Sequence, residues 1–225
     1  MSDKLPIRAV TFDVGGTLIR PWPSVGHVYA EVAVRHGAKN LLPDKINEQF
    51  RAAWRAKTNF NHTREDWAAL VESSFSGLTH RPPTDAFFPE LYERFSEPDT
   101  WRIFDDVVPA LDALATMGIR LGAISNWDER LRPLLQRLNL SDYFEIIVVS
   151  CEVGFAKPAS VVFEVAVKKL GLPPGSILHV GDNLAADVEG ARTAGLRAVR
   201  IDRSSPAITN EQIASLSAVA PLCAG

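Results

Sequence analysis

Short, continuously apolar segments alternate with helical patterns through the second half of the chain. The clearest is Ile146-Ile147-Val148-Val149, four β-branched residues in succession. A strand that is apolar on both faces is typical of a parallel sheet covered by helices on both sides. Because parallel strands need long crossover connections, this alternation predicts a doubly wound α/β fold.

From residue 101 onwards we expect helices and strands in regular alternation. The expected strands are 120–124, 145–149, 177–180 and 198–201, with one earlier strand at 7–12. The expected helices are 109–117, 129–138, 159–170, 185–194 and a final one at 211–216. Together these segments predict a Rossmann-like parallel sheet core.

The character of the chain changes between the first strand and residue 101. Four helical stretches fit there, at 25–36, 44–56, 64–75 and 85–95, and no strand interrupts them. Gly37, an Asn/Thr cluster near residue 60, and Pro82-Pro83 separate them. We therefore expect a core domain of residues 1–21 and 101–225, and an all-helical cap of residues 22–100 inserted after the first strand.

Composition excludes several functional classes. The chain carries 24 Lys and Arg against 27 Asp and Glu, a net charge of −3, which gives no reason to expect binding to nucleic acid or a membrane surface. Two cysteines are too few for a disulfide framework or a Cys-rich zinc site. We see neither a signal peptide nor a transmembrane segment, so we expect a soluble, cytoplasmic protein that acts on a small molecule.

In an open parallel sheet, ligands bind beyond the carboxyl ends of the strands. The residues directly after the expected strands include Asp13, Ser125-Asn126 and Lys157. Asp13 fits a nucleophile or metal ligand, Ser125 and Asn126 fit hydrogen-bond donors to an anion, and Lys157 fits a phosphate counter-charge. Turn capping by Asp13, helix capping by Ser125 and Asn126, and a solvated Lys157 are the structural alternatives.

The most specific local pattern is His179-Val180-Gly181-Asp182-Asn183-Leu184-Ala185-Ala186-Asp187. It places Asp182 at a strand end and Asp187 in the first turns of the following helix. Carboxylate oxygens suit Mg²⁺, which needs only one or two carboxylates when water and phosphate complete its shell. The alternative is that the negative charges favour a helix N-terminus, which explains Asp187 better than Asp182.

Taken together, these motifs resemble the four motifs of the haloacid dehalogenase-like (HAD) hydrolase superfamily. They are Asp13-Val14-Gly15-Gly16-Thr17, Ser125-Asn126, Lys157-Pro158, and Gly181-Asp182 to Asp187. The helical insertion resembles that superfamily's C1 cap. The run from Glu152 to Asp202 resembles the members called haloacid dehalogenase-like hydrolase domain-containing proteins.

The resemblance implies a role for each motif residue. Asp13 is then the nucleophile that forms an aspartyl-phosphate, and Thr17 supports its loop. Gly16, Ser125, Asn126 and Lys157 then bind the phosphoryl group. Mg²⁺ is the implied cofactor, held by Asp13, the Gly15 carbonyl and Asp182, with Asp187 acting beside them or through water. The implied partner is a small phosphorylated substrate, and the implied assembly is a monomer or homodimer.

One position departs from the pattern. The phosphatases that the chain resembles carry a second Asp two residues after the nucleophile, as general acid and base, whereas this chain has Gly15. The loss of such a group costs ~10² to 10⁴ in rate. We therefore expect a Mg²⁺-dependent phosphatase-type hydrolase of low activity. A non-catalytic protein that binds a phosphorylated ligand or a protein, and a 2-haloacid dehalogenase-type hydrolase, stay open as alternatives.

Two aromatic residues near the motifs have candidate roles. His27 is the histidine closest in sequence to Asp13 in the insertion, and is a candidate proton donor. Trp127 directly follows Ser125-Asn126 and is a candidate for shaping the pocket. His179 fits a buried structural histidine.

Overall fold

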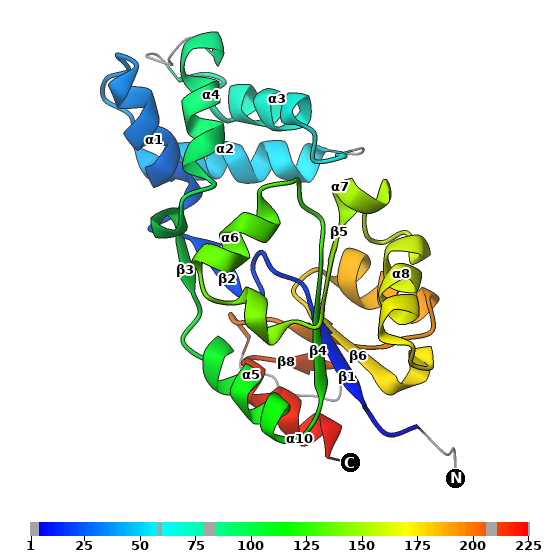
Figure 1. The fold of residues 1–225 in the computed structure, drawn as a ribbon. Helices are drawn as coiled ribbons and strands as arrows, with labels where there is room; N and C mark the ends of the chain where they lie inside the picture. Colours follow the sequence, from blue (N-terminus) through cyan, green and yellow to red (C-terminus); the bar gives the residue numbers. More distant parts are fainter. Residues whose placement is uncertain (1–4, 58–59, 79–83, 206–210, 225) are drawn as a thin grey trace. The chain divides into compact units, whose positions relative to one another are not determined.

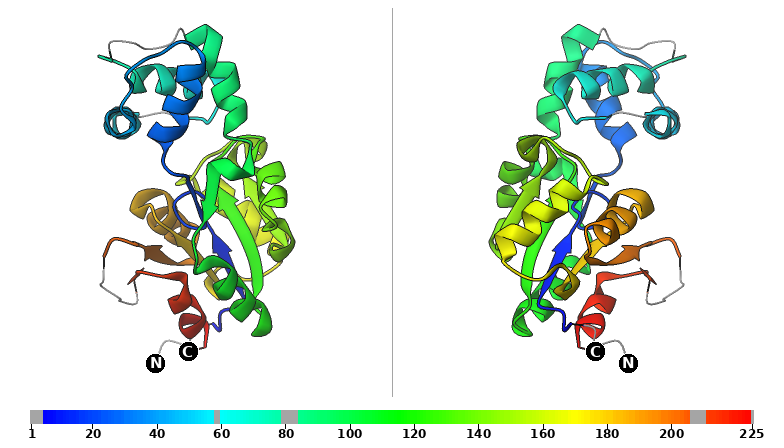
Figure 2. Two further views of the ribbon diagram at one scale, coloured as in Figure 1. Left: turned by 90° about the vertical axis from the view of Figure 1, so that its left-hand side faces the viewer. Right: turned by 90° about the vertical axis from the view of Figure 1, so that its right-hand side faces the viewer.

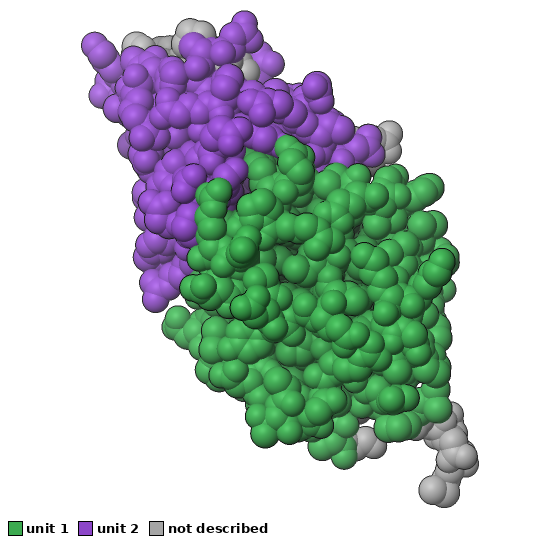
Figure 3. Space-filling model, in the orientation of Figure 1, with its two compact units in different colours: residues 1–19, 103–225 green, residues 20–102 purple. Residues whose placement is uncertain are grey.

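The computed structural model describes residues 5–57, 60–78, 84–205 and 211–224. The chain divides into two compact units, which Figure 3 colours separately. The core unit comprises residues 1–19 and 103–225, and the helical unit comprises residues 20–102.

A six-stranded parallel sheet forms the centre of the core unit, with the strand order β5-β4-β1-β6-β7-β8. Its strands are β1 Ala9–Phe12, β4 Arg120–Ser125, β5 Ile146–Val149, β6 Ile177–Gly181, β7 Arg197–Ile201 and β8 Gln212–Ile213. A second sheet pairs β2 Ile19–Pro21 with β3 Trp101–Ile103. In the large sheet, Phe12 aligns with Ala123 of β4 and with Val180 of β6. Asp13 therefore lies level with the carboxyl ends of both neighbouring strands.

Helices flank both faces of this sheet (Figures 1 and 2), which confirms the predicted doubly wound fold. They are α5 Val107–Thr116, α6 Leu131–Arg137, α7 Ser150–Val153, α8 Ser160–Leu170, α9 Gly190–Thr193 and α10 Val219–Cys223. On one face, Phe163 and Ala166 of α8 are fully buried in a cluster that includes Ile124 and Val148 of the sheet. Each large apolar side chain buried in this way stabilises the fold by ~1.5–3 kcal/mol.

The helical unit contains α1 Val25–Arg35, α2 Pro43–Ala56, α3 Arg64–Ser74 and α4 Thr84–Arg94. The predicted helical insertion after β1 is confirmed. The helix starts follow from local chemistry: Ser24 caps α1, Pro43 occupies the first turn of α2, and Thr63 forms a capping box with Asp66. Buried aromatic and aliphatic side chains, including Tyr29, Phe75, Phe87 and Leu91, fill the interior of this unit.

Two predicted helices differ from the observed elements. The helix expected at 211–216 is wrong: Gln212–Ile213 form β8, a 3₁₀ turn follows at Leu216–Ala218, and the last helix begins at Val219. Ile213 is fully buried because it pairs with Ile201 of β7, a long-range contact that overrides the local pattern. The helix expected at 185–194 is a π-helical turn, η4 Leu184–Glu189, followed by α9.

Among the described residues, no helix is long and apolar enough to cross a lipid bilayer.

Candidate active site

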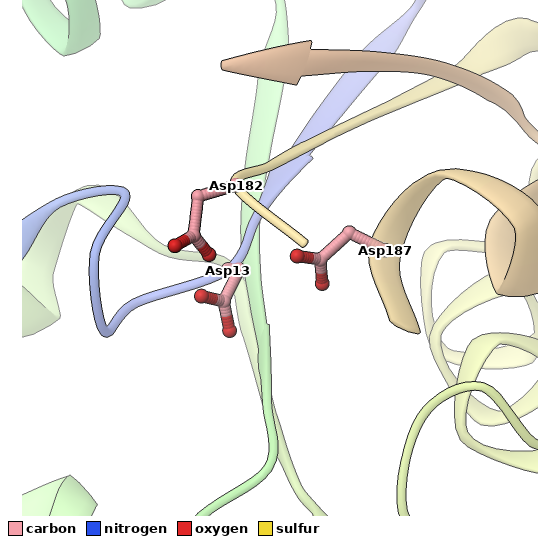
Figure 4. A group of neighbouring side chains, drawn as sticks. All are labelled: Asp13, Asp182 and Asp187. Carbon is pink, nitrogen blue, oxygen red and sulfur yellow. The ribbon is translucent and has the colours of Figure 1, made fainter. Parts of the chain in front are cut away.

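Three carboxylates converge at the carboxyl ends of β1 and β6. Asp13 follows β1, Asp182 follows β6, and Asp187 lies in η4. One oxygen from each carboxylate lies within 4.8 Å of the other two. Figure 4 shows Asp182 and Asp187 directed toward Asp13 from these separate segments. The sheet topology therefore brings together acidic residues that are far apart in the sequence.

Lys157 forms ion pairs with two of these carboxylates and is almost completely buried. Its ammonium donates to Asp13 Oδ1 at 2.7 Å, to Asp187 Oδ1 at 2.5 Å and to the Ile124 carbonyl oxygen at 2.9 Å. An ammonium has three N–H donors, and the three bonds use all of them. Lys157 is therefore not a solvated surface lysine, and its charge stabilises Asp13 and Asp187.

The end of β4 holds both Asp13 and Lys157 in place. Ser125 Oγ donates to Asp13 Oδ1 at 3.1 Å, the same oxygen that Lys157 contacts. The Asn126 side chain bonds the Lys157 backbone twice: Nδ2 donates to the carbonyl oxygen at 2.9 Å, and Oδ1 accepts from the amide at 2.7 Å. Ser125 thus orients the carboxylate, and Asn126 fixes the loop that carries the lysine.

The three carboxylates differ in their affinity for protons. Burial raises the pKa of Asp13, although Lys157 opposes the shift. Burial alone would also raise the pKa of Asp187, but Lys157 and His179 hold it well below its usual value. Asp182 lies at the rim, and its carboxylate is partly desolvated beside the charges of Asp13 and Asp187; both effects raise its pKa to about 7. Burial would lower the pKa of Lys157, but Asp13 and Asp187 outweigh it and raise the pKa.

These residues fit a divalent cation. Three carboxylates face one ammonium, so two negative charges remain uncompensated when all four groups are ionised. Carboxylate oxygens are the hard donors that Mg²⁺ prefers. Asp187 already accepts hydrogen bonds from Lys157 and from the Asn183 amide, at 2.5 and 2.9 Å, whereas Asp182 is exposed at the rim. The donor set therefore favours Asp13 and Asp182 as direct ligands over Asp187.

Two glycines allow this close packing. Gly16 has a φ of +83°, and a Cβ built on it would lie 2.5 Å from Asp182 Oδ2. A Cβ on Gly181 would lie 2.2 Å from Asp187 Cγ. A larger residue at either position would displace a carboxylate of the cluster. The Gly16 amide donates to the Ile19 carbonyl oxygen at 2.8 Å, which closes the loop after Asp13.

Gly15 differs from Gly16 in its surroundings. Its φ lies outside the left-handed region, and a Cβ built on it would lie 3.2 Å from Cζ3 of the Trp127 ring. The space beside Gly15 is therefore occupied by an indole.

Thr17 is fully buried, and its hydroxyl has no hydrogen-bond partner in the described part of the chain.

Two further residues support this site: His179, predicted from the sequence as a buried structural residue, and Arg203, which sequence reasoning missed. His179 is buried; its Nε2 lies 3.4 Å from Asp187 Oδ1, and its Nδ1 lies 2.9 Å from Thr11 Oγ1. Arg203 follows β7 and donates to the Thr17 carbonyl oxygen at 2.7 Å. The sequence signal for Arg203 was its position, two residues after the end of the expected strand 198–201.

Comparison with known proteins identifies the family. The haloacid dehalogenase-like hydrolase family matches residues 7–195. The chain belongs to this family. Haloacid dehalogenase-like hydrolase domain-containing protein 3 of Homo sapiens is 32% identical over 207 residues, which cover 87% of this chain and 82% of the human protein. The predicted HAD resemblance is confirmed.

Solved structures of HAD proteins share the fold. A HAD phosphatase from Thermococcus onnurineus is 25% identical, with a TM-score of 0.68, and the match covers 96% of this chain and 97% of that one. A 2-haloacid dehalogenase from Pseudomonas syringae is 26% identical, with a TM-score of 0.65 and coverage of 97% and 98%. A HAD hydrolase from Bacillus subtilis, bound to magnesium, is 18% identical, with a TM-score of 0.78 and coverage of 97% and 99%. The last likeness shows the fold alone.

Proposed function

We propose that this HAD hydrolase is a Mg²⁺-dependent phosphatase that acts on a small phosphorylated molecule through an aspartyl-phosphate at Asp13. The observation that carries the proposal is the position of the Asp13 carboxylate. It is held by Lys157 and Ser125 through one oxygen, beside Asp182 and Asp187. A buried carboxylate that an ammonium stabilises through a hydrogen bond is suited to nucleophilic attack.

Each residue then has a defined part in the reaction. Asp13 attacks phosphorus and forms a new O–P bond, and the ester bond breaks with its electron pair on the leaving oxygen. Water then attacks phosphorus, and the Asp13 O–P bond breaks with its electron pair on the carboxylate, which releases inorganic phosphate. The proton that the water loses balances the one that the leaving oxygen takes from solvent. Asp13, the Gly15 carbonyl and Asp182 would hold Mg²⁺, with Asp187 acting through Lys157 and water. Bound Mg²⁺ supplies charge stabilisation for the phosphoryl oxygens. Gly16, Ser125, Asn126 and Lys157 are the proposed phosphoryl-binding group, and Thr17 supports the loop.

A dehalogenase is the second candidate, because Gly15 supplies no proton donor two residues after the nucleophile and a departing halide needs none. The relation to a solved 2-haloacid dehalogenase supports the same reading. The phosphatase is favoured by Asp182, which adds a third carboxylate to a site where Asp13 and Asp187 already share one ammonium, because the excess negative charge suits a metal ion.

The decisive experiment is a panel of phosphate esters and 2-haloacids, assayed with and without Mg²⁺. We expect release of inorganic phosphate that depends on Mg²⁺ and is abolished in Asp13→Asn. Halide release that persists in EDTA would establish the dehalogenase instead. Equal phosphate release by wild type and Asp13→Asn would contradict the proposed nucleophile.

A further inference from the structure

The Trp127 ring lies beside Gly15, in the loop that carries the nucleophile. A Cβ built on Gly15 would lie 3.2 Å from Trp127 Cζ3 and 4.0 Å from Cη2. These two atoms belong to the benzene edge of the indole, away from its N–H. The surface that faces Gly15 is therefore apolar and offers no proton.

The segments that carry this ring and the reacting carboxylate follow neighbouring strands. Gly15 is two residues after Asp13, and Trp127 is two residues after Ser125, whose hydroxyl donates to Asp13 Oδ1 at 3.1 Å. Strands β1 and β4 are adjacent and parallel, so both segments leave the sheet at the same edge. The ring therefore lies at the edge of the sheet where Asp13 is, beside the loop that follows Asp13.

The backbone of Trp127 is fixed by neighbouring side chains. The Trp127 amide donates to Ser150 Oγ at 3.0 Å, and the same hydroxyl donates to the Trp127 carbonyl oxygen at 3.1 Å. On one side, Asn126 is bonded twice to Lys157; on the other, the buried Asp128 pairs with Arg130 at 2.5 Å. Because the backbone on both sides of the ring is fixed, the position of Trp127 is set before any ligand binds.

We propose that Trp127 is a specificity-determining residue whose ring selects phosphate esters of planar aromatic alcohols over alkyl phosphates. This inference rests on the proposed phosphatase function. Two physical reasons support it. An aromatic leaving group gains stacking or edge contact with the indole, which an alkyl chain of similar size does not match. A phenolate also leaves without being protonated, because its aromatic ring delocalises the negative charge. This matters here because Gly15 supplies no proton donor.

The first test measures binding, so that it does not depend on turnover. Inorganic phosphate, methylphosphonate and phenylphosphonate are titrated calorimetrically, with Mg²⁺, into wild type, Trp127→Phe and Trp127→Ala. We expect wild type to bind phenylphosphonate about two- to tenfold more tightly than methylphosphonate, and Trp127→Ala to lose this preference while its affinity for inorganic phosphate is unchanged. Trp127→Phe should retain part of the preference. Met117→Ala, which removes an exposed apolar side chain at the C-terminal end of α5, is the control.

The second test compares kcat/KM for aryl and alkyl phosphates in the same variants. The ratio should fall in Trp127→Ala and stay at the wild-type value in Met117→Ala. An equal aryl preference in wild type and Trp127→Ala would overturn the role of Trp127 while the phosphatase function stood. Failure of all three phosphoryl ligands to bind wild type would overturn the proposed function and this inference with it. If Trp127→Ala does not fold, Trp127→Phe replaces it. A lower phenylphosphonate-to-methylphosphonate affinity ratio and a lower aryl-to-alkyl kcat/KM ratio than in wild type would support the role of Trp127, and unchanged ratios would overturn it.

Discussion

The Lys157 ammonium lies 2.5 Å from Asp187 Oδ1, and both side chains are buried. The same ammonium contacts Asp13, so one cation serves two carboxylates that come from different strand ends. Removing one partner of a buried ion pair leaves an uncompensated charge, which costs ~3–5 kcal/mol.

The first prediction concerns Lys157→Ala. Its free energy of unfolding should fall by about 3–5 kcal/mol without metal, and by less with saturating Mg²⁺, which replaces the lost positive charge. Its affinity for inorganic phosphate should fall about tenfold or more. Urea unfolding and calorimetry measure the two effects. The exposed Lys168→Ala is the control, and phosphate affinity equal to wild type would remove Lys157 from the phosphoryl site.

The second prediction concerns Asp182→Asn. Mg²⁺ affinity should fall by orders of magnitude in this variant. Asp187→Asn should lower it less, because the Asp187 carboxylate is already bonded to Lys157 and to the Asn183 amide. Because burial and the neighbouring charges raise the pKa of Asp182 to about 7, protons compete with the metal below that pH. Wild-type Mg²⁺ affinity should therefore rise between pH 6 and 8. Calorimetry at several pH values tests this, with the exposed Glu189→Gln as control; unchanged affinity in Asp182→Asn would exclude the site.

The third prediction concerns Gly15→Asp, which introduces a carboxyl group beside the nucleophile. Turnover of phosphate esters should rise by up to ~10² to 10⁴, with the larger gain for alkyl esters, whose poor leaving groups depend more on a proton donor. The backbone at Gly15 is not left-handed, so the obstacle is the Trp127 ring at 3.2 Å. The gain should therefore be larger in the double variant Gly15→Asp with Trp127→Phe.

Gly15→Asn is the control, because its amide has the size of the carboxyl group but no acidic proton to transfer. A melting curve and a Mg²⁺ titration accompany each assay. A folded, Mg²⁺-binding Gly15→Asp with no gain on any ester, alone or in the double variant, would show that the missing acid does not limit the reaction.

The fourth prediction concerns the pH dependence of stability at Asp106. Burial alone would raise the pKa of this carboxylate, but hydrogen bonds from Arg203, Ser215 and the Leu216 amide lower it below its usual value. A folded-state pKa below the unfolded one contributes stability at neutral pH, which is lost as the pH falls through the folded-state value. Asp106→Asn should lower the free energy of unfolding at pH 7 by about 1.5–3 kcal/mol, and by progressively less toward pH 3.

Urea unfolding at pH 7, 5 and 3 measures this difference. The exposed Asp142→Asn serves as the matched carboxylate control. A constant difference between wild type and Asp106→Asn across this range would show that the Asp106 charge does not stabilise the fold.

The sequence alone determined the elements whose causes are local. Apolar periodicity, capping residues and prolines placed the four helices of the insertion, and each observed end lies within one residue of its predicted position. Continuously apolar segments such as 146–149 indicated parallel strands. Because such strands end at one edge of the sheet, the pattern also indicated that Asp13, Ser125, Lys157 and Asp182 would lie near one another.

The tertiary structure decided what depends on contacts between distant segments. Ile213 belongs to a strand because β7 presents an edge for it to pair with, which no local pattern around residue 213 records. Gly16, rather than Gly15, carries the left-handed backbone against Asp182, and the space beside Gly15 holds an indole from a segment more than a hundred residues away. Arg203, which follows β7, contacts the Thr17 carbonyl oxygen only because the fold brings these distant segments together. Side-chain contacts across a sheet are set by strand order and register, which the sequence encodes only through the completed fold.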